Sequence, residues 1–330
     1  MNGKRERQSR ALAWVLWPLA ALVWSGASPA AYPDRPLRLV VSFPPGGSAD
    51  FQARIVGPKL TEQLRQQVVI DNRSGGSGVV ALEIVAKAAP DGYTLLLGPM
   101  SGLAMNPALF SKLPYDSARD FAPISMTSRV TLALAASVSL PANSVKELVA
   151  LAKASPGKFT YGSTGIGNVT HLAGEMLKTN AGIDLVHVPY KGAGPQLIDV
   201  ISGNVAVGFT SLTAAIPHVR SGRLKALVVT SKQRSSAAPD IPTVSEVGMP
   251  EIEIATGWFG ILAPAHTPKA IISRLNAEIV KVIKTPDVQT RFTGQGLDPA
   301  TSTAEEFAAL IKSDLVKWAK VIKQAGIRAE

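Results

Sequence analysis

The chain alternates short apolar runs of strand length with amphipathic helical patterns, and this alternation restricts it to few folds. In its first third the predicted strands cover residues 37–43, 68–70 and 94–97, and the predicted helices cover 49–65 and 79–88. The helix over 49–65 places Val56, Leu60 and Leu64 on one face. Strand, helix, strand in this order is typical of a parallel sheet covered by helices on both faces.

The same alternation restarts after residue 130. Strands are predicted at 131–136, 159–161, 185–188, 205–209 and 227–229, and helices at Ser144, near Asn168 and near Pro195. An apolar run over 252–262 precedes a helix opened by Thr267 and a last helix from about Thr303. With 330 residues and no Ser/Gly/Pro tether, the chain is expected to form two closely packed α/β lobes. A crevice at the strand ends is then the expected ligand site.

Composition excludes several classes of function. The chain has no cysteine, which rules out disulfides, thiol nucleophiles and cysteine-ligated metals. Its four histidines are spread over nearly a hundred residues, so no histidine metal site is expected. The net charge is +10, but no dense Lys/Arg run occurs after residue 10 and aromatic residues make up only 6%, which argues against nucleic-acid binding.

The first thirty residues have the three parts of a secretory signal peptide. Lys4, Arg5, Arg7 and Arg10 precede an apolar stretch over 11–23, and a small-residue segment ends at Ala30. The apolar stretch of 13 residues contains Pro18 and is shorter than the roughly 20 residues of a bilayer span. We therefore expect cleavage after Ala30 and export of the remainder; an uncleaved membrane anchor is the alternative.

Glycine-rich turns lie between strands and helices in both halves of the chain, at 43–50, 73–78, 161–168 and 189–194. Such turns leave backbone N–H groups unpaired at the positive end of a helix, where an anion binds. For any one of them a tight turn is the favoured explanation, but four in equivalent places favour a binding cleft. The phosphate motifs G-x-x-x-x-G-K-[ST] and G-x-G-x-x-G are absent.

Several side chains near these turns have two possible roles. Ser48 and Asp50 are expected to cap the helix, although Asp50 is also placed to pair with a ligand amine. Lys191 and Arg73 are candidates to neutralise an acid, and Tyr190 either lines the cleft or packs. For a hydrolase, Ser163 with His171 is the best available pair, but G-x-S-x-G and H-E-x-x-H do not occur.

Many short motifs, in order along the chain, resemble the Bug/TctC family of periplasmic solute-binding proteins. The first is YPDRPLRLVVSFPPGGSAD over residues 32–50. The others cover residues 69–73, 89–95, 113–116, 120–121, 161–163, 171–175, 187–192, 241–246 and 263–264. The resemblance therefore spans essentially all of the chain after residue 30.

The resemblance implies a two-lobed α/β periplasmic-binding-protein fold of type II. Each lobe would be a mostly parallel sheet flanked by helices, and the chain would cross between lobes near residues 130 and 258. Residues 31–130 and 258–330 would form lobe 1, residues 131–257 lobe 2, and residues 1–30 the signal peptide.

The resemblance also implies a periplasmic monomer without enzymatic activity, cofactor or metal, which delivers a small organic acid to the membrane subunits of a tripartite tricarboxylate transporter. A sensor for a signalling receptor and a secreted serine hydrolase are the alternatives. The implied ligand-binding residues are Phe43, Pro44, Gly46, Gly47, Ser48, Asp50, Ser101, Ser163, Thr164, Gly165, Asn168, Tyr190, Lys191 and Thr210. Many family members carry an Asp where this chain has Thr210-Ser211, so a ligand without an amino group is expected.

Overall fold

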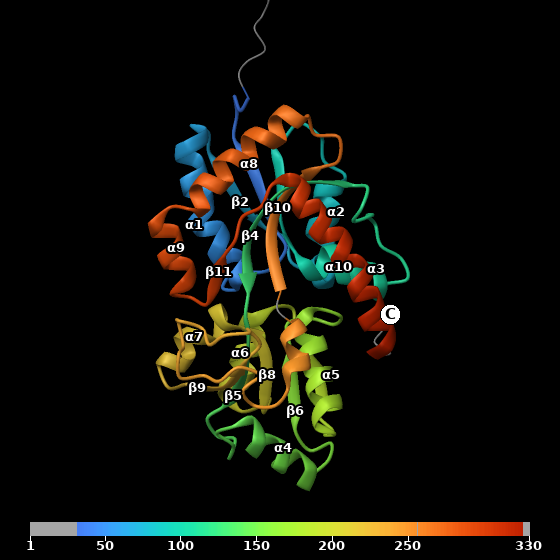
Figure 1. Ribbon diagram of the computed structural model, residues 1–330, viewed down its shortest axis with the longest axis vertical. Coiled ribbons are helices and arrows are strands. Elements are labelled where there is room, and N and C mark those ends of the chain that lie inside the picture. The colour runs from blue at the N-terminus through green and yellow to red at the C-terminus, as the bar shows by residue number, and fades with distance from the viewer. Residues whose placement is uncertain (1–31, 256, 326–330) are drawn as a thin grey trace, which may run out of the picture.

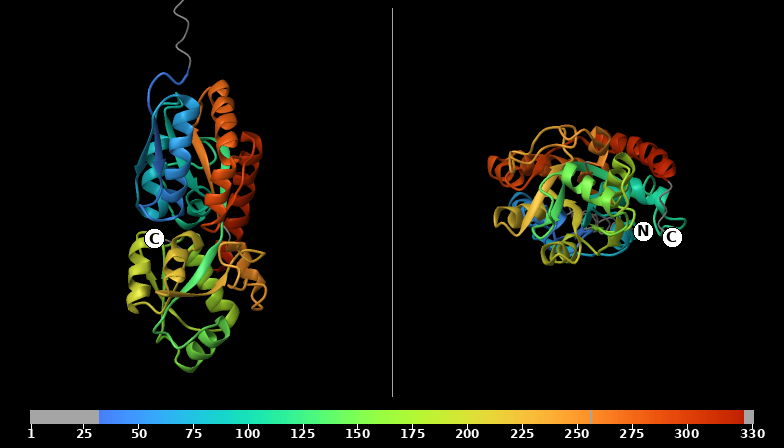
Figure 2. Two further views of the ribbon diagram at one scale, coloured as in Figure 1. Left: turned by 90° about the vertical axis from the view of Figure 1, so that its left-hand side faces the viewer. Right: turned by 90° about the horizontal axis from the view of Figure 1, so that it is seen from below.

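A computed structural model describes residues 32–255 and 257–325 and shows two α/β lobes stacked along the long axis of the molecule (Figures 1 and 2). The signal peptide predicted over residues 1–30 lies outside the described residues. We call the six-stranded sheet with its helices lobe 1 and the five-stranded sheet with its helices lobe 2. The two-lobed α/β architecture expected from the sequence is confirmed.

Lobe 1 is built on a mixed sheet with the strand order β11-β4-β10-β3-β1-β2. Its strands are β1 (Leu37–Val41), β2 (Val68–Asn72), β3 (Thr94–Pro99), β4 (Phe121–Val130), β10 (Gly257–Pro264) and β11 (Leu297–Pro299). β1 pairs in parallel with β2 and β3, whereas β10 runs antiparallel to β3 and β4, and β11 antiparallel to β4.

Helices cover both faces of this sheet (Figure 1). They are α1 (Ser48–Leu64), α2 (Val79–Ala86), α3 (Asn106–Leu109), α8 (Lys269–Ile283), α9 (Pro286–Thr293) and α10 (Ala304–Ala325), with short helices η1 (Gly76–Gly78) and η2 (Ser101–Met105). Alternate residues of β3 enter opposite cores. Leu95 and Leu97 pack with α1, α8 and α9, and Leu96 packs with α2 and α10.

Lobe 2 has the strand order β7-β6-β8-β5-β9. Its strands are β5 (Leu132–Ser137), β6 (Thr160–Ser163), β7 (Val186–Pro189), β8 (Val207–Ser211) and β9 (Leu224–Val229). Its helices are α4 (Val145–Ala154), α5 (Val169–Ala181), α6 (Ala193–Ser202), α7 (Leu212–Arg220) and η3 (Pro250–Ala255). β6 is parallel to β7 and β8, and β5 is antiparallel to its two neighbours.

The two sheets are joined where β4 continues into β5, with only Thr131 between them. The returning strand β10 begins at Gly257, which lies opposite Val130 of β4. The outgoing strand β4 and the returning strand β10 therefore lie side by side in the middle of the molecule (Figure 2). Among the helices of the described ranges, none combines the length and the apolar character needed to cross a bilayer.

Candidate functional site

A pocket lies between the lobes, where the glycine-rich turns meet the paired strands β4 and β10. Its walls come from both lobes, and none of the described residues that line it is charged. The lining residues are Phe43, Pro44, Gly47, Ser48, Ala49, Pro99, Met100, Ser101, Val130, Leu132, Thr164, Asn168, Val169, Thr170, Gly192, Ala193, Ser211, Gly257, Trp258 and Phe259. Any anion bound here would be held by neutral dipoles.

Two helices begin at this pocket without a capping side chain. Gly47 precedes α1 and Gly192 precedes α6, and neither helix start has a side-chain cap. The first intrahelical bond of α1 runs from the Phe51 N–H to the Gly47 carbonyl, so the N–H groups of the three residues before Phe51 lie ahead of it. By contrast, α4, α5 and α7 begin with side chains that accept from their first turns. The two glycine-led helix starts thus present free N–H dipoles to one pocket.

The expected capping role of Ser48 and Asp50 is wrong, because Gly47 is the N-cap residue. Asp50 instead shapes the preceding turn: its Oδ2 accepts from the Gly46 N–H at 3.1 Å and from Arg54 Nε at 2.9 Å. Burial would raise the pKa of Asp50, but these hydrogen bonds outweigh burial and hold the pKa below its usual value. Asp50 is 4% exposed and does not line the pocket.

On the lobe 2 side, the loop 163–168 is held by its own polar side chains. The Asn168 Oδ1 accepts from the N–H groups of Thr170 and His171 at 3.0 and 3.2 Å and so caps α5, whose start near Asn168 was expected from the sequence. Asn168 Nδ2 donates to Thr164 Oγ1 at 2.8 Å, and the Thr164 N–H donates to Thr170 Oγ1 at 2.9 Å. Thr164, Asn168 and Thr170 line the pocket, and these hydrogen bonds hold their side chains in place.

The lobes touch each other over this pocket. Ser77 Oγ of lobe 1 donates to the Ile166 carbonyl of lobe 2 at 2.5 Å. A Cβ atom on Gly192 would lie 2.6 Å from Pro44, and one on Gly167 would lie 2.7 Å from Leu109. The cleft is therefore closed, and glycines permit this close approach.

The structure brings half of the residues implied by the resemblance to the pocket: Phe43, Pro44, Gly47, Ser48, Ser101, Thr164 and Asn168. The others stand behind or beside its wall: Gly46, Asp50, Ser163, Gly165, Tyr190, Lys191 and Thr210. Tyr190 donates to Asp199 Oδ2 at 2.6 Å, and burial and this carboxylate raise its pKa to about 12. Lys191 is exposed, and the Thr210 Oγ1 is buried without a hydrogen-bond partner.

The apolar wall of the pocket was missed by sequence reasoning. Val130, Leu132, Trp258 and Phe259 contribute to it from the strands that join the lobes. The sequence offered a way to predict this wall, because the chain was expected to cross between the lobes near residues 130 and 258. Side chains at a crossing necessarily lie beside an interlobe pocket.

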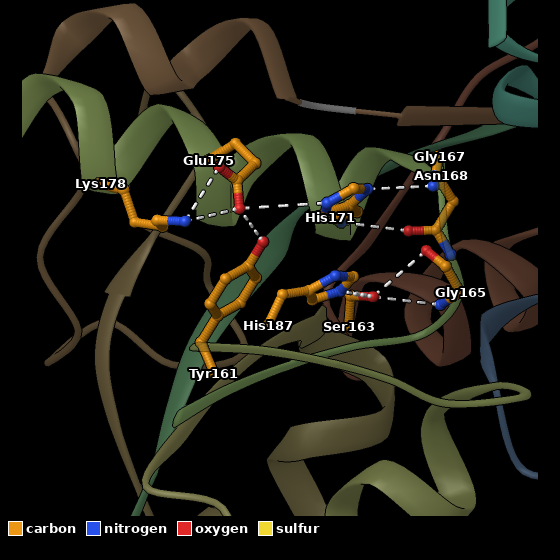
Figure 3. Close-up of polar contacts among 9 residues, drawn as sticks. All are labelled: Tyr161, Ser163, Gly165, Gly167, Asn168, His171, Glu175, Lys178 and His187. Atoms are coloured by element: carbon orange, nitrogen blue, oxygen red, sulfur yellow. Dashed lines mark hydrogen bonds and ion pairs between the residues drawn. The ribbon is translucent and has the colours of Figure 1, made fainter. Parts of the chain in front are cut away.

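The Ser163 and His171 pair, the best available for the hydrolase alternative, does not form. Ser163 is fully buried, and its Oγ lies 2.7 Å from Nε2 of His187 instead (Figure 3). His171 stacks on His187 with its ring centroid 4.0 Å away. Within the described ranges, no group of three His, Cys, Asp or Glu side chains is arranged to hold a metal.

The chain is similar to proteins of known family. The model of the family described as tripartite tricarboxylate transporter family receptor matches residues 52–327. Protein BugT of Bordetella pertussis is 37% identical over 298 residues, covering 90% of this chain and 91% of BugT. A solved R. palustris protein with adipate is 34% identical with a TM-score of 0.87, covering 90% of this chain and 99% of that one. MatC of Rhodopseudomonas palustris with bound malate is 30% identical with a TM-score of 0.81, covering 88% of this chain and all of that one (100%).

Proposed function

Because the chain belongs to the tripartite tricarboxylate transporter receptor family, a family of periplasmic binding proteins, we propose that it captures a small organic carboxylate between its lobes. The observation that carries this proposal is the pair of glycine-led helix starts, at Gly47 and Gly192, that face one pocket. Each charge-assisted hydrogen bond contributes about 1.5–3 kcal/mol. Four such bonds, after desolvation and closure costs, are compatible with micromolar affinity, about −8 kcal/mol.

We further propose that the ligand lacks an amino group. No Asp or Glu is among the described residues that line the pocket. Asp50, whose Oδ1 is buried without a hydrogen-bond partner, lies outside this lining, and its Oδ2 already accepts from Arg54 and the Gly46 N–H. An ammonium group in this pocket would therefore lose water without gaining a charged partner. The apolar wall of Val130, Trp258 and Phe259 suits a hydrocarbon body instead. The acids named with the two R. palustris structures, adipate and malate, both lack an amino group.

The lobes proposed for capture are residues 31–130 with 258–330 and residues 131–257. Membership of β4 and β10 in one sheet and of β5 in the other supports this division. A ligand that bridges the N-termini of α1 and α6 would favour the closed cleft over an open one. We propose that the closed, loaded monomer, exported to the periplasm, docks on the membrane subunits of a tripartite transporter, as the family description implies.

A thermal-shift screen of carboxylic acids, followed by calorimetry, tests the ligand class. We expect at least one acid without an amino group, among adipate, malate and aromatic acids, to raise the midpoint of unfolding. A ligand present at 100 times its Kd adds about 2.7 kcal/mol to the free energy of unfolding. Aspartate and glutamate are the matched amino controls. A shift with these two and with none of the other acids contradicts the proposal.

A further inference from the structure

Two histidines form a stacked pair behind the ligand-side loop of lobe 2 (Figure 3). His171 lies in the first turn of α5 and His187 in β7. Their ring centroids are 4.0 Å apart with an interplanar angle of 5°, and Tyr161 of β6 stacks on His187 at 4.8 Å. The proposed binding function uses neither ring directly, since neither lines the pocket.

Each ring bonds one end of the loop 163–168. At the far end, the Gly167 N–H donates to Nδ1 of His171 at 3.1 Å. At the near end, Nε2 of His187 lies 2.7 Å from Ser163 Oγ, which in turn donates to the Gly165 carbonyl at 3.2 Å. The loop held between these bonds carries Thr164 and Asn168, which line the pocket. The histidine pair thus supports the binding surface from behind.

The bond from Gly167 requires a neutral His171. A ring nitrogen that accepts an N–H carries no proton, so in the neutral ring the proton is on Nε2. If Nδ1 were protonated, its N–H would face the Gly167 N–H, and two donors cannot form a hydrogen bond with each other. Protonation of Nδ1 would therefore break this bond. Two stacked imidazolium rings 4.0 Å apart would also repel each other, so the pair resists taking up two protons.

The groups around the pair come from three elements. Glu175 and Lys178 of α5 lie beside it, with His171 Nε2 4.0 Å from Glu175 Oε1. Glu175 also accepts from the Tyr161 hydroxyl of β6 at 2.5 Å and from Lys178. The helix η3, which also packs on α5, carries the exposed Glu251, and Glu253, which accepts from Ser245. Burial lowers the pKa of His171, and burial followed by the charge of His171 lowers that of His187 to about 4.

We propose that His171 and His187 are positioning residues that hold the ligand-side loop while both rings are neutral, and that protonation of His171 releases it. The inference rests on the proposed function, because it assigns acid-dependent ligand release to the same site. Both pKa values lie below the ordinary 6.5, so the folded state binds fewer protons than the unfolded chain. The support is therefore complete above pH 6.5 and is lost as the pH falls toward 4.

Two variants of His171 separate the loss of its hydrogen bond with the Gly167 N–H from the protonation of its ring. His171→Asn keeps an acceptor oxygen near the position of Nδ1 but cannot be protonated in this range, whereas His171→Leu removes the acceptor. His266 provides the matched control, since it is exposed and has φ +66, a conformation that asparagine tolerates. His266→Asn should keep the pH profile of the parent.

The first readout needs no ligand. The hydrogen-exchange protection factor of the Gly167 amide, measured by ¹⁵N NMR, should fall about tenfold between pH 7.5 and pH 4 in the parent. It should stay constant in His171→Asn and be low at both pH values in His171→Leu. Equal protection of Gly167 in the parent at both pH values would overturn the proposal.

The second readout is the Kd of adipate by calorimetry at the same two pH values. We expect the parent to bind about tenfold more weakly at pH 4, and His171→Asn to match the parent at pH 7.5 and to lose less affinity in acid. Because the parent and His171→Asn are compared at the same pH, the protonation state of adipate affects both Kd values equally. Tighter binding by the parent in acid, or an equal loss in both proteins, would contradict the inference. If no acid binds at all, the proposed function fails while the Gly167 measurement still decides the role of the histidines.

Discussion

Gly47→Val is expected to weaken carboxylate binding by a hundredfold or more while leaving the fold intact. Gly47 has φ −97 and ψ 178, a conformation that valine adopts readily, and no atom lies within 4 Å of a Cβ built there. The open space is the pocket, which Gly47 lines at the start of α1. The new methyl groups would occupy the place where a carboxylate approaches the free N–H groups.

The measurement is the Kd of the strongest binder from the acid screen, with the unliganded unfolding midpoint as the check on folding. Ala309→Val is the control: it adds a β-branched side chain at an exposed position of α10, a helix that contributes no residue to the pocket lining. We expect the control to bind with the affinity of the parent, and both variants to unfold within a few degrees of it. Parental affinity in Gly47→Val would mean that the ligand sits elsewhere.

The turns at Gly47 and Gly192 could be predicted from the sequence because their cause is local. A strand, a glycine-rich turn and a helix follow one another within a dozen residues, and the structure keeps that order at β1 and α1 and again at β7 and α6. The helix starts at Ser144 and near Asn168 were predicted for the same reason and are confirmed, and both residues cap their helices. In each case the determining atoms are close neighbours along the chain.

Strand β4 was not predicted, because its burial depends on a distant residue. Its middle is polar, yet Thr127 and Ser128 are fully buried. Both hydroxyls donate to Gln52 Oε1 of α1, at 2.8 and 2.9 Å, which removes the cost of burying them. Gln52 is 75 residues from Thr127 in the sequence, so the local sequence around β4 does not indicate this hydrogen bond. The pocket wall contributed by Val130 and Trp258 depends in the same way on how β4 and β10 pair.

Gly192→Ala is expected to weaken ligand binding by about ten- to a hundredfold through a different cause, obstruction of lobe closure. A Cβ on Gly192 would lie 2.6 Å from Cγ and 3.0 Å from Cδ of Pro44, across the gap between lobes. The proline ring is rigid, so the lobes must part to relieve the overlap. If the closed form is populated less, the apparent Kd rises by the same factor. An overlap that costs about 1–3 kcal/mol gives the stated range.

Part of any loss could arise from backbone strain, because Gly192 has φ +118. Strain at Gly192, which has φ +118 and ψ 179, would lower the unfolding midpoint of unliganded Gly192→Ala. Gly182→Ala tests whether a lowered midpoint alone changes the Kd: Gly182 has φ +59 at the C-terminus of α5, and a Cβ there meets nothing within 4 Å. We expect Gly182→Ala to lower the unfolding midpoint without changing the Kd. In small-angle scattering, Gly192→Ala should keep a larger radius of gyration at saturating ligand than the parent does. If Gly192→Ala closes and binds like the parent, the contact between Pro44 and Gly192 does not limit closure. The lobes would then close around the ligand in an arrangement that does not bring these two residues together.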